Sequence, residues 1–287
     1  MTRLRVPLLF AASLLFAIGN AMADERWQTL PPTPTLPKPG LTGRVEVNGA
    51  RIWYAEWNVA ATGTPVILLH GGYANSSYFG HLVGALAEHG YRVIAMDTRG
   101  HGRSTRSDTP YTYHLLAEDV IGVLHGLHVA RVSVVGWSDG GSTGYDLAIH
   151  HPDAVAALFA FGANADLSAL KDGFDTAPTF VAYLGRVREE YRRLSPTPTG
   201  WASFDAAVGT MWSTEPNFTA DQLRSIRVRT MVADGEHDEA IRPDHLRYVS
   251  ETIPGARLVF LPGVSHFAML QDPAAFDAAV LAFLDGK

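Results

Sequence analysis

The sequence predicts an α/β fold, a mostly parallel eight-stranded sheet flanked by helices on both faces, with a helical cap insertion. Three observations predict it. The 287 residues, 47% of them hydrophobic, suffice for a large buried core. From residue 44 onward, short apolar segments alternate with segments of helical spacing, as in parallel sheets covered on both faces. The alternation is interrupted once, at residues 164–220, which predicts the cap.

The chain begins with two segments that we expect to lie outside the fold. Residues 1–23 combine two arginines, an apolar run and a small-residue site at Ala21 to Ala23, which is typical of a signal peptide. The apolar run is too short to span a bilayer, so we expect an exported protein, periplasmic or secreted, with no stable membrane insertion after cleavage. Residues 24–43 are a Pro-rich linker, with five prolines in residues 31–40, and predict an extended tether rather than packed structure.

Residues 44–163 and 221–287 supply the core. Its expected strands are 44–47, 51–57, 66–69, 92–96, 131–135, 154–161, 229–233 and 257–261, and its expected helices are 77–89, 113–127, 140–150, 243–252 and 273–284. The first two strands flank Asn48-Gly49, a hairpin signal, and add an antiparallel edge. Because chemistry in such sheets lies at the carboxyl ends of the strands, the loops that follow the strands are the place to look for a site.

Residues 164–220 form a helical cap of 57 residues in this prediction, and insertions of this kind often cover an active site. We expect most of their aromatic side chains to pack within the cap and a few to face a pocket. The mixed charges of residues 186–193 predict a solvated helix face. The aromatic residues of the cap are Phe174, Phe180, Tyr183, Tyr191, Trp201, Phe204, Trp212 and Phe218.

The strongest chemical motif is Gly136-Trp137-Ser138-Asp139-Gly140, which follows an expected strand and opens an expected helix. This G-x-S-x-G pattern is a nucleophile elbow, in which a tight turn lifts the serine hydroxyl above the sheet. Ser138 is therefore the candidate nucleophile. The helix that follows directs its positive N-terminus at the oxyanion that an attacked carbonyl develops.

A serine nucleophile needs a base, and the base needs an acid to orient it. His266 follows the last strand and is the candidate base. Asp238 follows the strand at 229–233 and is the candidate acid, with Asp234 and Glu236 as rivals. The chain order Ser–Asp–His is the order expected for a nucleophile elbow on this architecture.

The remaining site residues surround this triad. The turn His70-Gly71-Gly72 follows the strand at 66–69, so the backbone N–H groups of Gly72 and Asp139 are the expected oxyanion donors. Tyr73, Trp137 and Asp139 are the expected substrate contacts.

These residues together resemble the α/β-hydrolase family over residues 44–287. Residues 97–104 (DTRGHGRS) match the family's D-x-R-G-H-G-x-S segment, whose role there is structural, and we expect Asp97 to pair with Arg99. Within the family, residues 136–141 and 161–165 resemble the valacyclovir-hydrolase-like carboxylesterases. That resemblance implies that the Asp139 side chain attracts a substrate ammonium group. The alternative is that the carboxylate caps the helix that it begins.

Composition and spacing exclude other classes. No cysteine is present, which excludes disulfide scaffolds and thiol nucleophiles, and a net charge of −6 argues against a nucleic-acid partner. His125/His128 and His150/His151 lack the H-E-x-x-H frame of metal hydrolases and are expected on helix surfaces. We predict no cofactor and no metal. Epoxide and haloalkane hydrolases of this fold would carry aspartate in place of Ser138.

The sequence thus predicts a serine hydrolase that cleaves small carboxylic esters through an acyl-enzyme. Lactone hydrolysis, carbon–carbon bond hydrolysis and cofactor-free perhydrolysis use the same triad and remain alternatives. A ligand-binding receptor without turnover is a more remote one, since a complete triad is present. Neither the natural ester nor the oligomeric state follows from the sequence.

Overall fold

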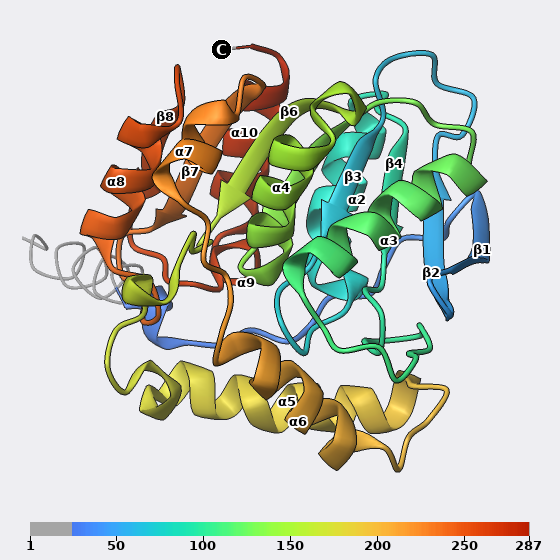
Figure 1. The fold of residues 1–287 in the computed structure, drawn as a ribbon, viewed down its shortest axis with the longest axis horizontal. Coiled ribbons are helices and arrows are strands. Elements are labelled where there is room, and N and C mark those ends of the chain that lie inside the picture. The colour runs from blue at the N-terminus through green and yellow to red at the C-terminus, as the bar shows by residue number, and fades with distance from the viewer. Residues whose placement is uncertain (1–24, 287) are drawn as a thin grey trace, which may run out of the picture.

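A computed structural model describes residues 25–286 and contains the predicted eight-stranded sheet (Figure 1). The strand order is β1-β2-β4-β3-β5-β6-β7-β8; β1, β2 and β4 pair antiparallel, and all pairs from β4 to β8 are parallel. The predicted fold class is confirmed. The strands are β1 Leu41–Val47, β2 Ala50–Trp57, β3 Val66–Leu69, β4 Val93–Met96, β5 Val132–Trp137, β6 Val155–Phe161, β7 Arg229–Gly235 and β8 Arg257–Leu261.

Helices cover both faces of the sheet (Figure 1). One face carries α3, α4, α7 and α8, and the other carries α2, α9 and α10. The α-helices are α2 Gly80–Glu88, α3 Tyr113–Gly126, α4 Asp139–His150, α5 Pro178–Leu194, α6 Trp201–Trp212, α7 Ala220–Ser225, α8 Pro243–Thr252, α9 Ala268–Gln271 and α10 Pro273–Leu284. Short 3-10 helices are η1 Arg26–Gln28, η2 Ser76–Phe79, η3 Pro152–Ala154, η4 Leu167–Ala169 and η5 Phe174–Thr176. Among residues 25–286, no helix is both long enough and apolar enough to cross a membrane.

Burial follows the position of each strand in the sheet. Every residue of β3, β4 and β5 is buried, because helices pack on both sides of these central strands. Strand β1 lies at the edge, and its residues alternate between exposed and partly buried. Asn48 and Gly49 connect β1 to β2 with φ values of 47° and 76°, the left-handed conformation that a two-residue hairpin turn requires.

The segment after β4 differs from its prediction in one pairing. Asp97 accepts hydrogen bonds from Ser76 and Arg103, whereas the guanidinium of Arg99 makes two hydrogen bonds to the Asp119 carboxylate of α3, at 2.5 and 2.6 Å. The expected pairing of Asp97 with Arg99 is therefore wrong. The side chains of Asp97 and Arg99 diverge, so that the first reaches Ser76 of η2 and the second reaches Asp119 of α3.

The Pro-rich segment is extended, as predicted, but it is packed against the protein. The predicted signal peptide at 1–23 lies outside the described residues. From residue 25 onward, side chains of the core and cap bind backbone carbonyls of the segment: Gln271 donates to Trp27 and Thr29, and Arg186 of α5 donates to Leu30 and Pro31. The expectation of an unpacked tether is wrong here, because proline removes backbone donors but leaves carbonyl acceptors available.

The insertion places α5 and α6 beyond the carboxyl ends of the strands (Figure 1). Phe180, Tyr183 and Tyr191 of α5 and Phe204 of α6 are buried. Residues 186–193 have the expected exposed charges, but Glu190 is buried and accepts hydrogen bonds from Thr33 and Asn75. The insertion therefore lies directly above the loops in which the candidate catalytic residues occur.

Candidate active site

A cavity of about 350 Å³ lies between the carboxyl ends of the strands and the inserted helices. It brings together most of the site residues predicted from sequence. Asp238 does not line it but lies behind His266, to which it is hydrogen bonded. The predicted residues that line the cavity are Gly72, Tyr73, Trp137, Ser138, Asp139 and His266.

Ser138 has the backbone conformation of a nucleophile elbow. Its φ of 54° and ψ of −120° are strained for a residue with a side chain. A Cβ atom on Gly136 would lie 2.3 Å from the carbonyl oxygen of Gly140, and one on Gly140 would lie 1.9 Å from that of Leu69. Both glycines of the motif are therefore required by the close approach of β5, α4 and β3.

His266 and Asp238 form a buried pair. Nδ1 of His266 lies 2.6 Å from Oδ2 of Asp238, which leaves Nε2 free to face the nucleophile. Oδ1 of Asp238 accepts hydrogen bonds from the backbone of Ala240 and Ile241 at 2.6 and 2.8 Å, so the carboxylate is held at both oxygens. Within the described residues Ser138 Oγ has no hydrogen bond, and the contact from a serine to its base often tightens only with bound substrate.

The charges of this pair stabilise each other. Burial alone would lower the pKa of His266, but the negative charge and hydrogen bond of Asp238 outweigh it, and the pKa is raised. Burial would likewise raise the pKa of Asp238, but the charge of His266 outweighs it, and the pKa is lowered. This arrangement favours a proton on Nδ1 and supports a base that acts through Nε2.

The two rival acids occupy different positions. Asp234 is buried beside Asp238, and its carboxyl is hydrogen bonded to that of Asp238. Burial, and next the charge of Asp238, raise the pKa of Asp234 well above its usual range, which favours its protonated form beside Asp238. Glu236 is exposed and accepts a hydrogen bond from the backbone of Gly263. Of the three acids, Asp238 is the one in contact with His266.

The two predicted oxyanion donors are available. Within the described chain, the backbone N–H groups of Gly72 and Asp139 have no hydrogen-bond partner, and both residues line the cavity. The carbonyl of Gly72 accepts a hydrogen bond from Tyr183 of α5 at 2.5 Å, which fixes the orientation of this peptide. A Cβ atom on Gly72 would lie 2.2 Å from the ring of Trp212, so only glycine fits under the cap.

The side chain of Asp139 is bound by other side chains rather than by its helix. It accepts hydrogen bonds from Tyr113 Oη at 2.8 Å and from Trp212 Nε1 at 2.9 Å. No backbone N–H of α4 donates to it, so the capping alternative is not what the structure shows. Burial raises its pKa to about 6, although the hydrogen bonds from Tyr113 and Trp212 oppose that shift. This carboxylate is an acceptor shared between core and cap.

The negative charge of the cavity was not predicted from the sequence. Three further carboxylates line the cavity, those of Asp175, Asp205 and Glu215, whereas no lysine or arginine among residues 25–286 does. Asp205 accepts a hydrogen bond from Tyr73 Oη at 2.6 Å, and Glu215 accepts one from the backbone of Tyr113. These acids come from the cap and its flanks, where composition indicated aromatic residues but not which polar ones face inward.

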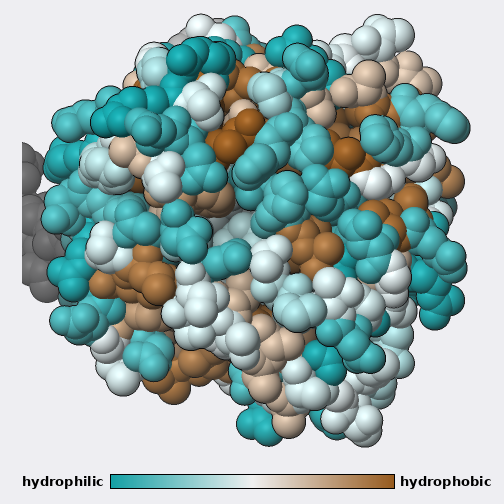
Figure 2. Space-filling view, in the orientation of Figure 1, coloured by the Kyte–Doolittle hydropathy of each residue, from teal (hydrophilic) through white to brown (hydrophobic). Residues whose placement is uncertain are grey.

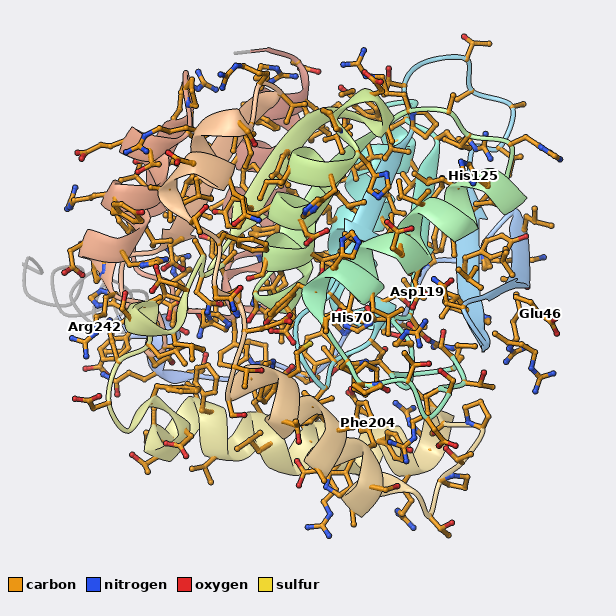
Figure 3. All side chains as sticks on the ribbon, in the orientation of Figure 1. Glu46, His70, Asp119, His125, Phe204 and Arg242 are labelled. Carbon is orange, nitrogen blue, oxygen red and sulfur yellow. The ribbon has the colours of Figure 1, made fainter. Side chains whose placement is uncertain are left out.

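Trp137 and Tyr73 contribute little accessible surface. They are 1% and 8% exposed, and the hydroxyl of Tyr73 is already bound. Both are mainly packing residues at the cavity wall: Tyr73 contacts Trp212 edge-on, and Phe204 of α6 packs against it from the cap (Figure 3). Each of the two side chains therefore offers only a small surface to the cavity, and their role as substrate contacts stays a prediction.

The rest of the cavity wall is apolar and extends to its mouth. Leu167 and Leu184 line the cavity and are 39% and 36% exposed, and Val181 nearby on α5 is 56% exposed. Figure 2 shows hydrophobic atoms gathered at lower left, over η4 and α5. The arrangement suits a small substrate with an apolar part near the mouth and a neutral or positive group near the acids. Other apolar lining residues are Leu170, Phe174, Phe180, Ala240 and Ile241.

Comparison with known proteins agrees with this geometry. Residues 66–279 match the alpha/beta hydrolase family. A relative from Metapseudomonas resinovorans, 2-hydroxy-6-oxo-6-(2'-aminophenyl)hexa-2,4-dienoic acid hydrolase, is 28% identical, over 85% of this chain and 90% of its own. Serine hydrolase BPHL of Mus musculus is 25% identical, over 85% of this chain and 86% of its own.

Solved structures are similar along the whole length of their chains. Est816, described as an N-acyl homoserine lactone degrading enzyme, has 27% identity and a TM-score of 0.68, with 84% of this chain and 100% of that chain covered. The fold, and the serine hydrolase resemblance drawn from the sequence, are confirmed by these matches.

Proposed function

The chain belongs to the alpha/beta hydrolase family and is a hydrolase of the esterase, lactonase or carbon–carbon hydrolase type, and from that premise we propose that it cleaves small carboxylic esters. One observation carries the proposal. Ser138, at a strained elbow, shares an acidic and aromatic cavity with His266, whose other ring nitrogen contacts Asp238. A nucleophile, a base and an orienting acid in this arrangement perform acyl transfer.

In the first half-reaction, His266 Nε2 takes the proton of Ser138 while Oγ attacks the ester carbonyl. The carbonyl oxygen becomes an oxyanion that accepts hydrogen bonds from the N–H groups of Gly72 and Asp139. Collapse of this intermediate expels the alcohol, which receives the proton from His266. In the second half-reaction, water attacks the acyl-serine with the same base, and the carboxylic acid leaves.

The charge of the cavity narrows the substrate class. Among residues 25–286, four carboxylates and no lysine or arginine line it, so an anionic acyl group would meet repulsion from the acids without a lysine or arginine to pair with. The relative from Metapseudomonas resinovorans is named for an acid substrate, and nothing here matches such a group. We therefore place neutral and cationic esters ahead of substrates that carry a carboxylate.

Asp139 supports a preference for amino esters. With a pKa of about 6, its carboxylate is mostly ionised at neutral pH, and it lies one residue from the nucleophile. An ammonium group on the acyl part would meet this charge in a partly buried place, where ion pairing is stronger than in water. The resemblance to valacyclovir-hydrolase-like esterases implies the same preference.

Lactones form the second candidate class, because Est816 is described as a lactone-degrading enzyme and a lactone is a neutral cyclic ester. We also propose that the chain is exported, on the composition of residues 1–23 alone.

The test is kcat/KM on three esters with the same alcohol, whose acyl groups carry an α-amino group, a hydrogen or a carboxylate at one position. We expect the amino ester to exceed the hydrogen analogue about a hundredfold, about 2.7 kcal/mol, and the carboxylate ester to be the poorest. The Ser138→Ala variant should lose nearly all turnover on each. A preference for the carboxylate ester, or a tenth of the activity left in Ser138→Ala, would contradict the proposal.

Asp139→Asn identifies the source of the amino preference. It should reduce the preference at least tenfold and leave hydrolysis of the hydrogen analogue nearly unchanged, because the amide oxygen still accepts from Tyr113 and Trp212. Asp175→Asn, at another acid of the cavity, is the matched control. An equal loss in both variants would assign the preference to the general field of the cavity rather than to Asp139.

A further inference from the structure

We propose that a cluster of imidazole and carboxylate groups on α3 and α4 binds a divalent transition metal ion of the Zn²⁺ type. The cluster consists of His114 and Glu118 of α3, Asp146 and His150 of α4, and His151, the residue after α4. None of these residues touches the cavity, and none takes part in the proposed hydrolysis.

Two imidazoles converge on one carboxylate oxygen. His114 Nδ1 lies 3.0 Å and His150 Nδ1 lies 3.1 Å from Oδ1 of Asp146. One ligand atom from each of the three residues can be chosen so that all lie within 4.8 Å of one another. In a zinc site with bonds of about 2.0–2.2 Å, ligand atoms are about 3.0–3.6 Å apart, so small side-chain rotations suffice to seat the ion.

Helical spacing explains why the groups face each other. His114 and Glu118 are four residues apart on α3, and Asp146 and His150 are four residues apart on α4, so each pair lies on one face of its helix. The two helices pack side by side on one face of the sheet (Figure 1). The packing therefore brings an i,i+4 pair from each helix into one cluster.

The cluster combines a buried carboxylate with imidazoles that solvent can reach. The side chain of Asp146 is 4% exposed, whereas those of His114 and His150 are 54% and 38% exposed. A buried carboxylate with two exposed imidazoles at the surface leaves an entry path for an ion from solvent. The imidazoles stack edge to face with ring centroids 4.7 Å apart, which keeps both near the carboxylate.

A second imidazole–carboxylate pair lies against the first. His151 Nε2 lies 2.6 Å from Oε1 of Glu118, and the same oxygen lies 3.8 Å from His114 Nε2. Glu118 therefore faces the ring nitrogen of His114 that points away from Asp146, and it can orient this imidazole as an outer partner when Nδ1 binds an ion. The candidate ligands are His114, Asp146 and His150.

The donor types select the kind of ion. Imidazole nitrogen with carboxylate oxygen suits Zn²⁺, Ni²⁺ and Cu²⁺, whereas Ca²⁺ and Mg²⁺ prefer oxygen ligands alone. From the sequence, we expected His150 and His151 on a helix surface and predicted no metal. His114 is 36 residues from His150 in the chain, so only the packing of α3 on α4 reveals the cluster.

The test is calorimetric titration of the full chain, free of any histidine tag, with ZnCl₂. We expect one equivalent to bind with a Kd tighter than about 50 μM. His114→Gln and His150→Gln should each weaken binding at least tenfold, about the effect of losing an ordering or ligating group. His125→Gln is the matched control, an exposed histidine at the other end of the same helix, and should bind as wild type does (Figure 3).

Every other pattern of results contradicts the proposal. A Kd weaker than about 50 μM excludes a built site, and wild-type affinity in either cluster variant places the ion elsewhere, for instance at His266. Circular dichroism of each variant shows whether it has folded, and if one of the two has not, the other decides the test. MgCl₂ in tenfold excess over zinc should not displace it. Since binding is measured directly, the outcome does not depend on ester hydrolysis.

Discussion

Residues 25–286 contain two clusters of aspartate and histidine, and these differ in position and in burial. Asp234, Asp238 and His266 lie at the carboxyl ends of the strands, and all three are buried. The other cluster, around Asp146, lies on two helices, with its two imidazoles open to solvent. In both, the potential ligand atoms lie within 4.8 Å of one another.

The comparison indicates that burial, and the number of hydrogen bonds that each group already makes, decide whether such a cluster transfers a proton or binds an ion. In the buried cluster, Asp238 is held at both oxygens and contacts His266, and the raised pKa of the neighbouring Asp234 favours its protonated form. Such a pair can hold and pass one proton. In the exposed cluster the imidazoles can turn and solvent has access, so an ion can enter.

We expect the largest effect from a substitution that breaks the buried pair of Asp238 and His266. Asp238→Asn should lower kcat for a good ester by about 10³–10⁴, because the amide favours the wrong tautomer of His266. Glu236→Gln is the control and should stay within about threefold of wild type, since Glu236 is exposed and contacts Gly263 rather than the base. Steady-state kinetics on both variants decide the acid. Greater damage from Glu236→Gln would show that the acid is wrongly assigned.

Asp139 tests the effect of burial on a carboxylate that is hydrogen bonded to Tyr113 and Trp212 rather than to a histidine. Its pKa is about 6 in the folded protein and near 3.8 when unfolded, so ionisation destabilises the fold as the pH rises through 6. Asp139→Asn removes this cost. The free energy of unfolding of the variant relative to wild type should rise by roughly 1–3 kcal/mol from pH 4 to pH 8.

Urea denaturation at the two pH values measures this change. Asp205→Asn, at a cavity acid on α6, is the control and should show a smaller pH dependence. A constant difference between variant and wild type would mean that the charge of Asp139 is not disfavoured by its surroundings.

Substitutions of Asp234 test whether this residue positions Asp238 in the buried cluster. Asp234→Ala removes the carboxyl that is hydrogen bonded to Asp238, and we expect kcat to fall about tenfold with little change in KM. Asp234→Asn should recover most of the loss, because its amide can still donate a hydrogen bond to Asp238. The pH profile of kcat/KM separates positioning from mere destabilisation. If the two variants behave alike and the profile does not move, Asp234 only fills space.

The smallest expected effect concerns the exposed cluster. His150→Gln should leave kcat/KM of the metal-free protein within about twofold, because the residue lies outside the cavity and its side chain is 38% exposed. Ester hydrolysis in the presence of a chelator is the measurement. A tenfold loss would mean that the two clusters are coupled through α4, contrary to the separation inferred here.

Residues near one another in the chain were predictable from sequence. The glycines around Ser138 fix the elbow, and the alternation of apolar and amphipathic segments fixes the strands and helices, because steric limits and periodicity act over a few residues. The order of Ser138, Asp238 and His266 also follows from the motif and the strands. These features needed no knowledge of how distant segments pack.

Only the tertiary structure decided the partners of residues far apart. Trp212 binds Asp139 from 73 positions away, Asp119 rather than Asp97 receives Arg99, and His114 meets His150 across two helices. The Pro-rich segment is bound rather than free for the same reason. Such contacts depend on how whole elements pack, and packing is set by the combined burial of many side chains rather than by any local pattern.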